Sequence, residues 1–397
     1  MISISEALKI IERETHPLKA ETIDLEKSVG RVLAQTVKAD MDLPPFNRSQ
    51  MDGFAVKSKD TKNAPVNLKI IGESIAGKCF DGKMKASESV RIMTGARLPE
   101  GADAVQKVEE TKEADGCVEI TEAVKSGQNV NLLASEIRRG ERIFGKGEIV
   151  TEQMIAALAS FGYAKIKVFR RPKIAILSTG SEIVEISQTP QRDQIRNSNS
   201  LMLKVFADRL GDAECLPLVR DDVESLTAAI ENALGNYDIL VTTGGVSVGD
   251  YDFTKPVLRD LDAEIFFERV SLKPGKPTVF AKRKNCLIFG LPGNPVSSAV
   301  TFYLFARTAI LRMQSAANCE LTKGFAVAAD KIKAAKERDS VLPALVATDE
   351  KGALIIESLR FNGSSNFIAF ARANALVFVP QGKNLEAGDV AEIMFLP

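Results

Sequence analysis

The feature that most constrains this chain is an alternation of short apolar runs with longer helical patterns, beginning near residue 172. The apolar runs have the length of buried strands, and they read KIAILSTG, ECLPLV, YDILVTTGG, PTVFAK and NCLIFGLPG. The segments between them repeat apolar residues with the helical period, and they read SNSLMLKVFADRLG, VESLTAAIENALG, FTKPVLRDL and NPVSSAVTFYLFARTAILRMQ. Strands that alternate with helices predict a three-layer α/β module with a mostly parallel sheet and helices on both faces.

The sequence on either side of this module follows different patterns. Ile4, Ala7, Leu8 and Ile11 recur at helical spacing and predict an N-terminal helix. Short β-like runs separated by Gly, Asp and Asn follow, and they read VNLKIIGE, SVRIMTG, AVQKVEE and GCVEITEAV. After about residue 318 the helical patterns stop, and five further runs predict a small β barrel: GFAVAADKI, LPALVATDE, GALIIESL, NALVFVPQG and DVAEIMFLP.

We therefore predict four domains in the 397 residues, a number compatible with this length. An N-terminal helical and linker domain comprises 1–45 plus 132–171, and a small β domain, 46–131, is inserted into it. The α/β domain spans 172–317, and the C-terminal β barrel spans 318–397. The segment after the insertion is expected to contain a helix and to rejoin the N-terminal helix.

Composition excludes several classes of protein. Lys+Arg and Asp+Glu both number 52, so no bulk charge favours a nucleic acid or an anionic membrane as partner. No apolar run approaches the roughly 20 residues that span a bilayer. The five cysteines are widely spaced without a CxxC pair, and His16 is the only histidine. This usage argues against disulfides, a thiolate zinc site and a His-rich metal site, and it indicates a cytoplasmic setting.

Three predicted strands end in glycine-containing loops. The first loop leads from ILSTG to Glu182, the second from ILVTTGG into VSVGDYD, and the third from LIFGLPG into NPVSS. Parallel strands end at one edge of a sheet, where ligands of open α/β folds bind. The glycines permit close backbone approach, and the helices that follow offer N–H groups to an anion. For any one loop, ordinary turn chemistry is the alternative explanation.

Four carboxylates lie at or just past these strand ends: Glu182, Asp221, Asp250 and Asp252. Oxygen ligands without His or Cys suit Mg²⁺, which often combines one or two carboxylates with substrate phosphates. A role as helix N-cap or first-turn acid remains the alternative, above all for Asp221 and Asp250.

A basic turn, ERVSLKPGKP, precedes the strand PTVFAK and carries Arg269, Lys273 and Lys276. Beside glycine loops and carboxylates, these cations favour a clamp for a phosphate or another oxyanion. A solvated charged loop is the alternative.

Taken together, these motifs resemble the molybdopterin molybdenumtransferase family, the molybdenum insertases, to which the E domain of gephyrin is related. The motifs follow the family's order from about residue 43 to 380, and they read PPFNRSQMDGFAV, RIMTGARLPEGADAV, ILSTGSEI, TTGGVSVGDYDFTK, SLKPGKP, GLPGNPVSS and NGSSNFIAFARANALVFVP. The resemblance implies an enzyme, a molybdopterin molybdotransferase, that converts adenylyl-molybdopterin and molybdate into molybdenum cofactor and AMP with Mg²⁺. It also implies a homodimer in which each site is shared between subunits.

The resemblance also implies roles for individual residues. Catalytic roles fall on Asp52, Thr94, Glu182, Asp221 and Asp252. The metal ligands among them are Glu182, Asp221 and Asp252. Asp52 and Thr94 would reach the site from the partner subunit. The glycine loops and the family motifs together give the expected substrate contacts as Gly244, Gly245, Ser247, Arg269, Lys273, Lys276, Pro292, Pro295, Ser298 and Ser364.

The chain departs from the family pattern before the return helix. Asn131 stands where the family usually has arginine, Ala134 where it has glycine, and Glu136 where it has aspartate. Asn47 replaces a common aspartate, and Arg269 replaces a common lysine. The first change takes away the basic side chain that the family has at this position, and Arg138 or Arg139 is the alternative source of a basic contact from this stretch.

Two other functions fit parts of the sequence. A molybdopterin adenylyltransferase would share the α/β module, but it would need none of the other domains. A gephyrin-like scaffold would share the fold, but it would have no need to keep the acids together. A transient contact with an adenylyltransferase is expected for the insertase, with neither nucleic acid nor membrane as partner.

Overall fold

The computed structural model describes residues 1–219, 222–245, 253–359 and 365–397. The chain divides into two compact units. The larger unit comprises Met1–Gln35, Lys146–Ile155 and Lys165–Pro397, and the smaller unit comprises Thr36–Gly145 and Ala156–Ala164. In the described ranges, no helix is both long enough and apolar enough to cross a membrane.

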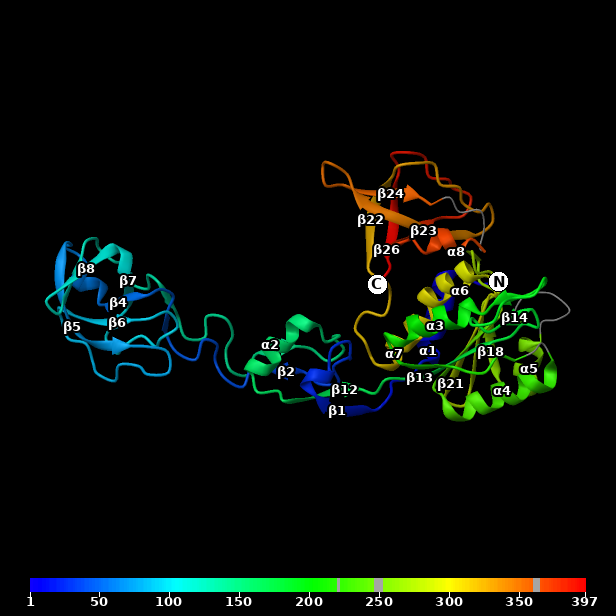
Figure 1. Ribbon diagram of the computed structural model, residues 1–397, viewed down its shortest axis with the longest axis horizontal. Coiled ribbons are helices and arrows are strands. Elements are labelled where there is room, and N and C mark those ends of the chain that lie inside the picture. The colour runs from blue at the N-terminus through cyan, green and yellow to red at the C-terminus, as the bar shows by residue number, and fades with distance from the viewer. Residues whose placement is uncertain (220–221, 246–252, 360–364) are drawn as a thin grey trace. The chain divides into compact units, whose positions relative to one another are not determined.

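A six-stranded sheet forms the centre of the larger unit (Figure 1). Its strands, in spatial order, are β16 (Asp212–Cys215), β13 (Lys173–Ser178), β17 (Ile239–Thr243), β21 (Cys286–Leu291), β20 (Val279–Arg283) and β18 (Glu264–Phe267). The first four run parallel, and the last two are antiparallel to their neighbours. The predicted mostly parallel sheet is confirmed. The run ECLPLV contributes only its first two residues to β16 and forms a single further bridge, between Val219 and Thr179, and β18 was not predicted.

Helices cover both faces of this sheet, as predicted. One face carries α3 (Ser198–Asp208), α6 (Pro295–Thr301) and α7 (Arg307–Met313), the last two joined by a π-helical turn over Phe302–Ala306. The other face carries α4 (Val223–Asn236) and α5 (Thr254–Asp260). Alternate side chains of β13 enter the two cores, Ile174 and Ile176 with Leu203 on one side, Ala175 and Leu177 with Leu226 on the other.

The N-terminal helix α1 (Ile4–Glu14) belongs to this α/β core. A capping box starts it, in which the Glu6 N–H donates to Ser3 Oγ at 3.1 Å and the Ser3 N–H donates to Glu6 Oε2 at 2.7 Å. Ala7 and Ile11 are fully buried in the same cluster as α3 and α6. The expectation that the segment after the insertion rejoins α1 is therefore wrong.

An extended segment, not α1, receives the chain when it returns from the smaller unit. β1 (Ala20–Asp24) pairs antiparallel with β12 (Lys165–Phe169). The helix expected in the return segment is present, but it is shorter than the helical pattern of the sequence predicts, since α2 covers only Glu152–Ser160.

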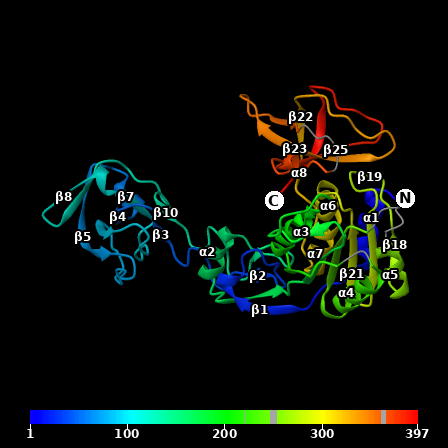
Figure 2. The same cartoon turned by 45° about the vertical axis from the view of Figure 1, so that its right-hand side comes forward.

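The C-terminal part of the larger unit is a closed β barrel, which confirms the prediction. Its strands pair in a ring in the order β23 (Asp339–Thr348), β24 (Leu354–Ser358), β22 (Lys323–Ala328), β26 (Val390–Phe395), β25 (Ala375–Val379) and back to β23. The barrel is joined to the α/β module by a short ladder between β19 (Leu272–Lys273) and β23, and by Val341, Leu376 and Met394, which enter the α/β core. Figure 2 shows the short helix α8 (Phe367–Phe370) beside α6.

The smaller unit contains the predicted β region as a six-stranded sheet. Its order is β7 (Ala104–Lys107), β4 (Gly53–Val56), β6 (Glu88–Ile92), β5 (Val66–Ser74), β9 (Cys117–Ile120) and β8 (Thr111–Ala114). Short ladders flank it, in which β3 (Arg48–Ser49) pairs with β10 (Val130–Asn131) and β2 (Val37–Lys38) with β11 (Arg142–Phe144). The division into four domains with the boundaries given above stays a prediction.

Candidate functional site

A cleft of about 1030 Å³ lies at the carboxyl edge of the α/β sheet. The carboxyl ends of β13 and β17 and the segments that follow β13, β17 and β21 line it. The lining residues are Ser178, Thr179, Gly180 and Glu182 from the first, Thr243–Gly245 from the second and Pro292–Pro295 from the third. The three strands are parallel neighbours, so their ends meet at one edge, as the sequence predicts. Among the expected site residues, this arrangement brings together Glu182, Gly244, Gly245, Pro292 and Pro295.

The glycines of the cleft are required by close packing between its loops. Gly244 has φ +94°, and a Cβ there would lie 2.6 Å from the backbone oxygen of Thr179. Gly245 has φ +62°, and its Cβ would lie 2.7 Å from Thr254 Oγ1. A Cβ on Gly293 would be 3.7 Å from the Gly244 Cα, so the second and third loops touch. Bulkier residues would push the loops apart. Gly244 and Gly245 both line the cleft, so backbone without side chains forms this part of its wall.

The N-terminus of α3 forms another wall of the cleft, which the sequence reasoning missed. Asn197 caps this helix by accepting from the Ser200 N–H at 3.2 Å. Asn199 Nδ2 donates to Thr243 Oγ1 at 3.0 Å and to the Gly293 carbonyl at 2.6 Å. One side chain thus ties the second loop to the third. The signal was available in RNSNS, an Asn- and Ser-rich stretch directly before a helical pattern.

The cleft carries one basic and one acidic side chain among its described lining residues. The acid is Glu182, which is exposed. The base is Arg196, also missed from the sequence, whose Nε donates to the Gln188 carbonyl at 3.0 Å. The two belong to a small parallel ladder, since Glu182 directly precedes β14 (Ile183–Val184), which pairs with β15 (Ile195–Arg196). Opposite charges therefore face one site.

The expected metal site can be tested only through Glu182. Asp221, Asp250 and Asp252 lie outside the described residues. Over the described ranges, no three His, Cys, Asp or Glu side chains group closely enough to hold a metal ion. The Glu182 carboxylate is an exposed oxygen donor on the cleft wall, which fits a hard cation such as Mg²⁺ that takes one or two protein carboxylates.

Several expected substrate contacts are not among the lining residues of this cleft or lie outside the described residues. Arg269, Lys273 and Lys276 are exposed, and from their turn only Pro277 lines the cleft. Ser298 is fully buried in α6, and its hydroxyl has no hydrogen-bond partner within the described structure. Ser247 and Ser364 lie outside the described residues.

In the smaller unit, Asp52 and Thr94 are brought together as a hydrogen-bonded pair. Asp52 Oδ1 accepts from the Thr94 N–H at 2.7 Å and from Thr94 Oγ1 at 2.8 Å. The backbone hydrogen bond, followed by the hydroxyl hydrogen bond, lowers the pKa of Asp52 below its ordinary value of 3.8. The pair therefore presents a carboxylate that stays ionised.

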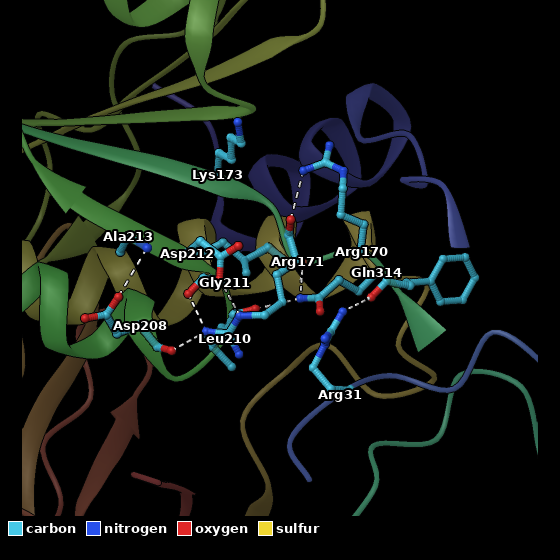
Figure 3. A network of polar contacts seen from close by, with 12 residues as sticks. Arg31, Arg170, Arg171, Lys173, Asp208, Leu210, Gly211, Asp212, Ala213 and Gln314 are labelled. Carbon is cyan, nitrogen blue, oxygen red and sulfur yellow. Dashed lines mark hydrogen bonds and ion pairs between the residues drawn. The ribbon is translucent and has the colours of Figure 1, made fainter. Parts of the chain in front are cut away.

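Opposite the cleft, polar contacts fix the amino edge of the sheet (Figure 3). Arg171, just before β13, donates from Nε to Asp212 Oδ1 at 2.8 Å and from Nη2 to the carbonyls of Asp208 and Gly211. Gln314 Nε2 donates to the Leu210 carbonyl at 2.8 Å. These bonds tie the start of β13 and the end of α7 to the end of α3, at the edge of the sheet opposite the cleft.

Comparisons with known proteins cover nearly the whole chain. Three family descriptions match it: MoeA N-terminal region (domain I and II) over residues 2–162, Probable molybdopterin binding domain over 175–312, and MoeA C-terminal region (domain IV) over 326–396. The Molybdopterin molybdenumtransferase of Staphylococcus epidermidis (strain RP62A) is 33% identical over 99% of this chain and 95% of its own length. The protein of the same name from Staphylococcus aureus (strain Mu50) is also 33% identical, over 99% of this chain and 95% of its own length.

Solved structures agree with these matches. The molybdopterin biosynthesis moeA protein from Pyrococcus horikoshii OT3 aligns with a TM-score of 0.85 at 27% identity, covering 100% of both chains. The molybdopterin biosynthesis moea protein from Pyrococcus horikosii aligns with a TM-score of 0.81 at 31% identity, covering 100% of this chain and 99% of that one. The chain belongs to the molybdopterin molybdenumtransferase family, the MoeA proteins.

Proposed function

We propose that this chain is the enzyme that inserts molybdenum into molybdopterin, the last step in forming molybdenum cofactor. Its substrates are adenylyl-molybdopterin and molybdate, and its products are the cofactor and AMP. The observation that carries the proposal is the meeting of three strand-end loops in one cleft beside Glu182, within a chain that matches molybdenumtransferases over 99% of its length. The matches to the N-terminal and C-terminal regions favour the insertase over an adenylyltransferase.

The pyrophosphate of adenylyl-molybdopterin lies against the glycine loops in this proposal. Gly244 and Gly245 carry no side chain to keep an anion from the backbone. The first turn of α3 presents N–H groups at the cleft wall, where the helix dipole favours negative charge. Arg196 adds a positive charge. Asn199 keeps the two glycine-containing loops at a fixed separation.

In this proposal Glu182, Asp221 and Asp252 would hold Mg²⁺, which would supply charge withdrawal from the pyrophosphate. The loop Pro292–Pro295 binds molybdate, with Lys273 and Lys276 of the neighbouring turn offsetting its charge. No side chain of the cleft is needed as a nucleophile, since phosphate-bond cleavage depends mainly on positioning and electrostatics.

The second half of the site comes from another copy of the chain. In the proposed homodimer, Asp52 and Thr94 of the partner subunit complete the cleft, and a carboxylate with a lowered pKa suits contact with a metal or a basic group. The protein works in the cytoplasm and receives its substrate through a transient contact with an adenylyltransferase.

Reconstitution tests this function. Purified protein is incubated with adenylyl-molybdopterin, molybdate and Mg²⁺, and AMP and cofactor are measured with each component omitted in turn. We expect both products only in the complete mixture. ATP with molybdopterin should yield no adenylate, and formation of adenylate would identify an adenylyltransferase instead.

A pair of variants tests the assignment of Glu182. Glu182→Gln should lower AMP release at least tenfold, while Glu185→Gln, which changes an exposed acid outside the cleft lining, should leave it unchanged. Equal rates in both variants would remove Glu182 from the site.

A further inference from the structure

The C-terminal barrel domain contributes an exposed aromatic side chain to the cleft. Phe367, the first residue of α8, lines it together with Ser365. Its exposed fraction is 48%, and in the described structure only Phe46 and Phe325 are further large aromatic residues exposed to a comparable degree. Neither of those two lines the cleft. An apolar ring left uncovered inside a concave site indicates a ligand that covers it.

The position of Phe367 is fixed by contacts on both sides of it in the chain. Asn366 caps α8 by accepting from the Ala369 N–H at 3.3 Å, and the Ala371 N–H donates to the Phe367 carbonyl at 2.9 Å. Phe370, one turn further on, packs against the α/β core. The ring at position 367 is therefore presented by a helix that is anchored to the module forming the rest of the cleft.

The lining of the cleft divides into a polar and an apolar part. The glycine loops and the N-terminus of α3 supply the polar groups already described. The apolar part comprises Phe367, Ile183, Ile195, Pro190, Pro277, Pro292 and Pro295. The phenyl ring offers no hydrogen bond, so its contribution to binding is dispersion and stacking on a flat ring. Adenylyl-molybdopterin carries two such rings, adenine and pterin, attached to the pyrophosphate.

We propose that Phe367 is a substrate-contact residue that stacks on a flat heteroaromatic ring of the substrate, so that the C-terminal domain takes part in substrate recognition. This proposal rests on the proposed function for the identity of the ligand. Stacking explains why an apolar side chain stands uncovered at the edge of a site for an anion, since its partner is the heterocycle and not the phosphate.

Equilibrium binding separates the two rings without requiring turnover. The probes are AMP, ribose 5-phosphate and molybdopterin, each titrated into wild-type protein and Phe367→Ala. Loss of one stacked ring should weaken binding roughly 5- to 150-fold. A weaker AMP complex with unchanged ribose 5-phosphate binding identifies adenine as the stacked ring, and a weaker molybdopterin complex identifies the pterin.

Matched variants show whether the effect belongs to the ring. Phe367→Tyr keeps a flat face and should bind within about twofold of wild type, while Phe367→Leu should bind like Phe367→Ala. Ile368→Ala is the control, because Ile368 is the adjacent residue, is 63% exposed and does not line the cleft. Thermal unfolding of each variant checks that α8 remains docked.

The two proposals fail in different ways. Unchanged binding of both AMP and molybdopterin in Phe367→Ala would overturn the stacking role while leaving AMP release by the wild-type protein intact. Absence of AMP release by the wild-type protein would overturn the proposed function, and the binding titrations would still decide the role of Phe367.

Discussion

At the scale of single residues, Gly245 is a position of the cleft where the backbone tolerates little change. We expect Gly245→Ala to destabilise the fold, since an alanine at φ +62° is strained and its Cβ would lie 2.7 Å from Thr254 Oγ1 and 3.2 Å from Thr179 Oγ1. The left-handed backbone costs about 1 kcal/mol, and the clash adds about 1–2 kcal/mol. Urea unfolding measures the sum.

Gly352→Ala is the matched control for this change. Gly352 has φ +82° in the turn between β23 and β24, but a Cβ there would meet no atom within 4 Å. Gly352→Ala should therefore lower the free energy of unfolding only by the cost of the left-handed backbone, about 1 kcal/mol. Equal losses at the two positions would contradict the tight packing of the second loop.

The pair Asp52 and Thr94 gives a prediction about proton binding. Thr94→Val removes the hydroxyl donor but keeps the backbone N–H, so the pKa of Asp52 should rise part of the way toward 3.8. A lowered pKa means that the contact stabilises the fold above pH 3.8, and that this stability is lost as pH falls through the lowered value.

Carboxyl NMR titration of Asp52 measures this shift. Thr111→Val is the control, because the Thr111 hydroxyl donates to the Val108 carbonyl at 2.8 Å and not to a carboxylate. An Asp52 pKa that is the same in wild type and Thr94→Val would show that the hydroxyl does not contribute.

At the scale of elements, the connection from β12 to β13 depends on Asp238. Arg170 donates two parallel hydrogen bonds to this carboxylate, both at 2.9 Å, and the Lys173 N–H donates a third at 2.7 Å. We expect Asp238→Ala to lower the free energy of unfolding by roughly 1–3 kcal/mol, because it removes the acceptor of three hydrogen bonds, two of them from the half-buried Arg170 side chain.

Asp24→Ala provides the comparison in urea unfolding. Asp24 pairs with Lys27 and Lys165, but its side chain is 46% exposed, and its removal should change stability by less than about 0.5 kcal/mol. If both variants lose the same free energy, the Asp238 network does not hold the two elements together.

At the scale of the whole molecule, the proposed sharing of sites between subunits predicts complementation. Asp52→Ala and Glu182→Ala change different units of the chain, and each should be inactive alone. A mixture of the two, unfolded and refolded together, should regain about a quarter of wild-type AMP release. About half of the dimers are then mixed, and one of the two sites in each mixed dimer is intact.

A mixture of Asp52→Ala and Thr94→Ala is the negative control. Both changes fall in the smaller unit, so no arrangement of two subunits restores an intact site. Activity in the first mixture that stays at the level of the separate variants would show that the two units act within one chain or that the copies do not associate.

The sequence by itself determined in which order helical, β and α/β segments follow one another along the chain. The spacing of apolar residues that distinguishes them is a local property of the chain. Strand–helix alternation sufficed for the parallel sheet, and strand ends marked by glycine sufficed to place Glu182 and Gly244 at one edge. The family's motifs assigned both Asp52 and Thr94 to the predicted site, and the two residues are hydrogen-bonded in the structure.

Only the tertiary structure decided which of these segments meet. The apolar face of α1 could pack against any apolar surface. Only the tertiary structure shows that Ala7 and Ile11 are buried in the α/β core. Asn199 and Phe367 look like ordinary polar and apolar residues in the sequence, and they became site residues because folding brings loops, α3 and α8 around one cleft. Contacts between residues far apart in the chain depend on how elements pack, and a local pattern does not encode that choice.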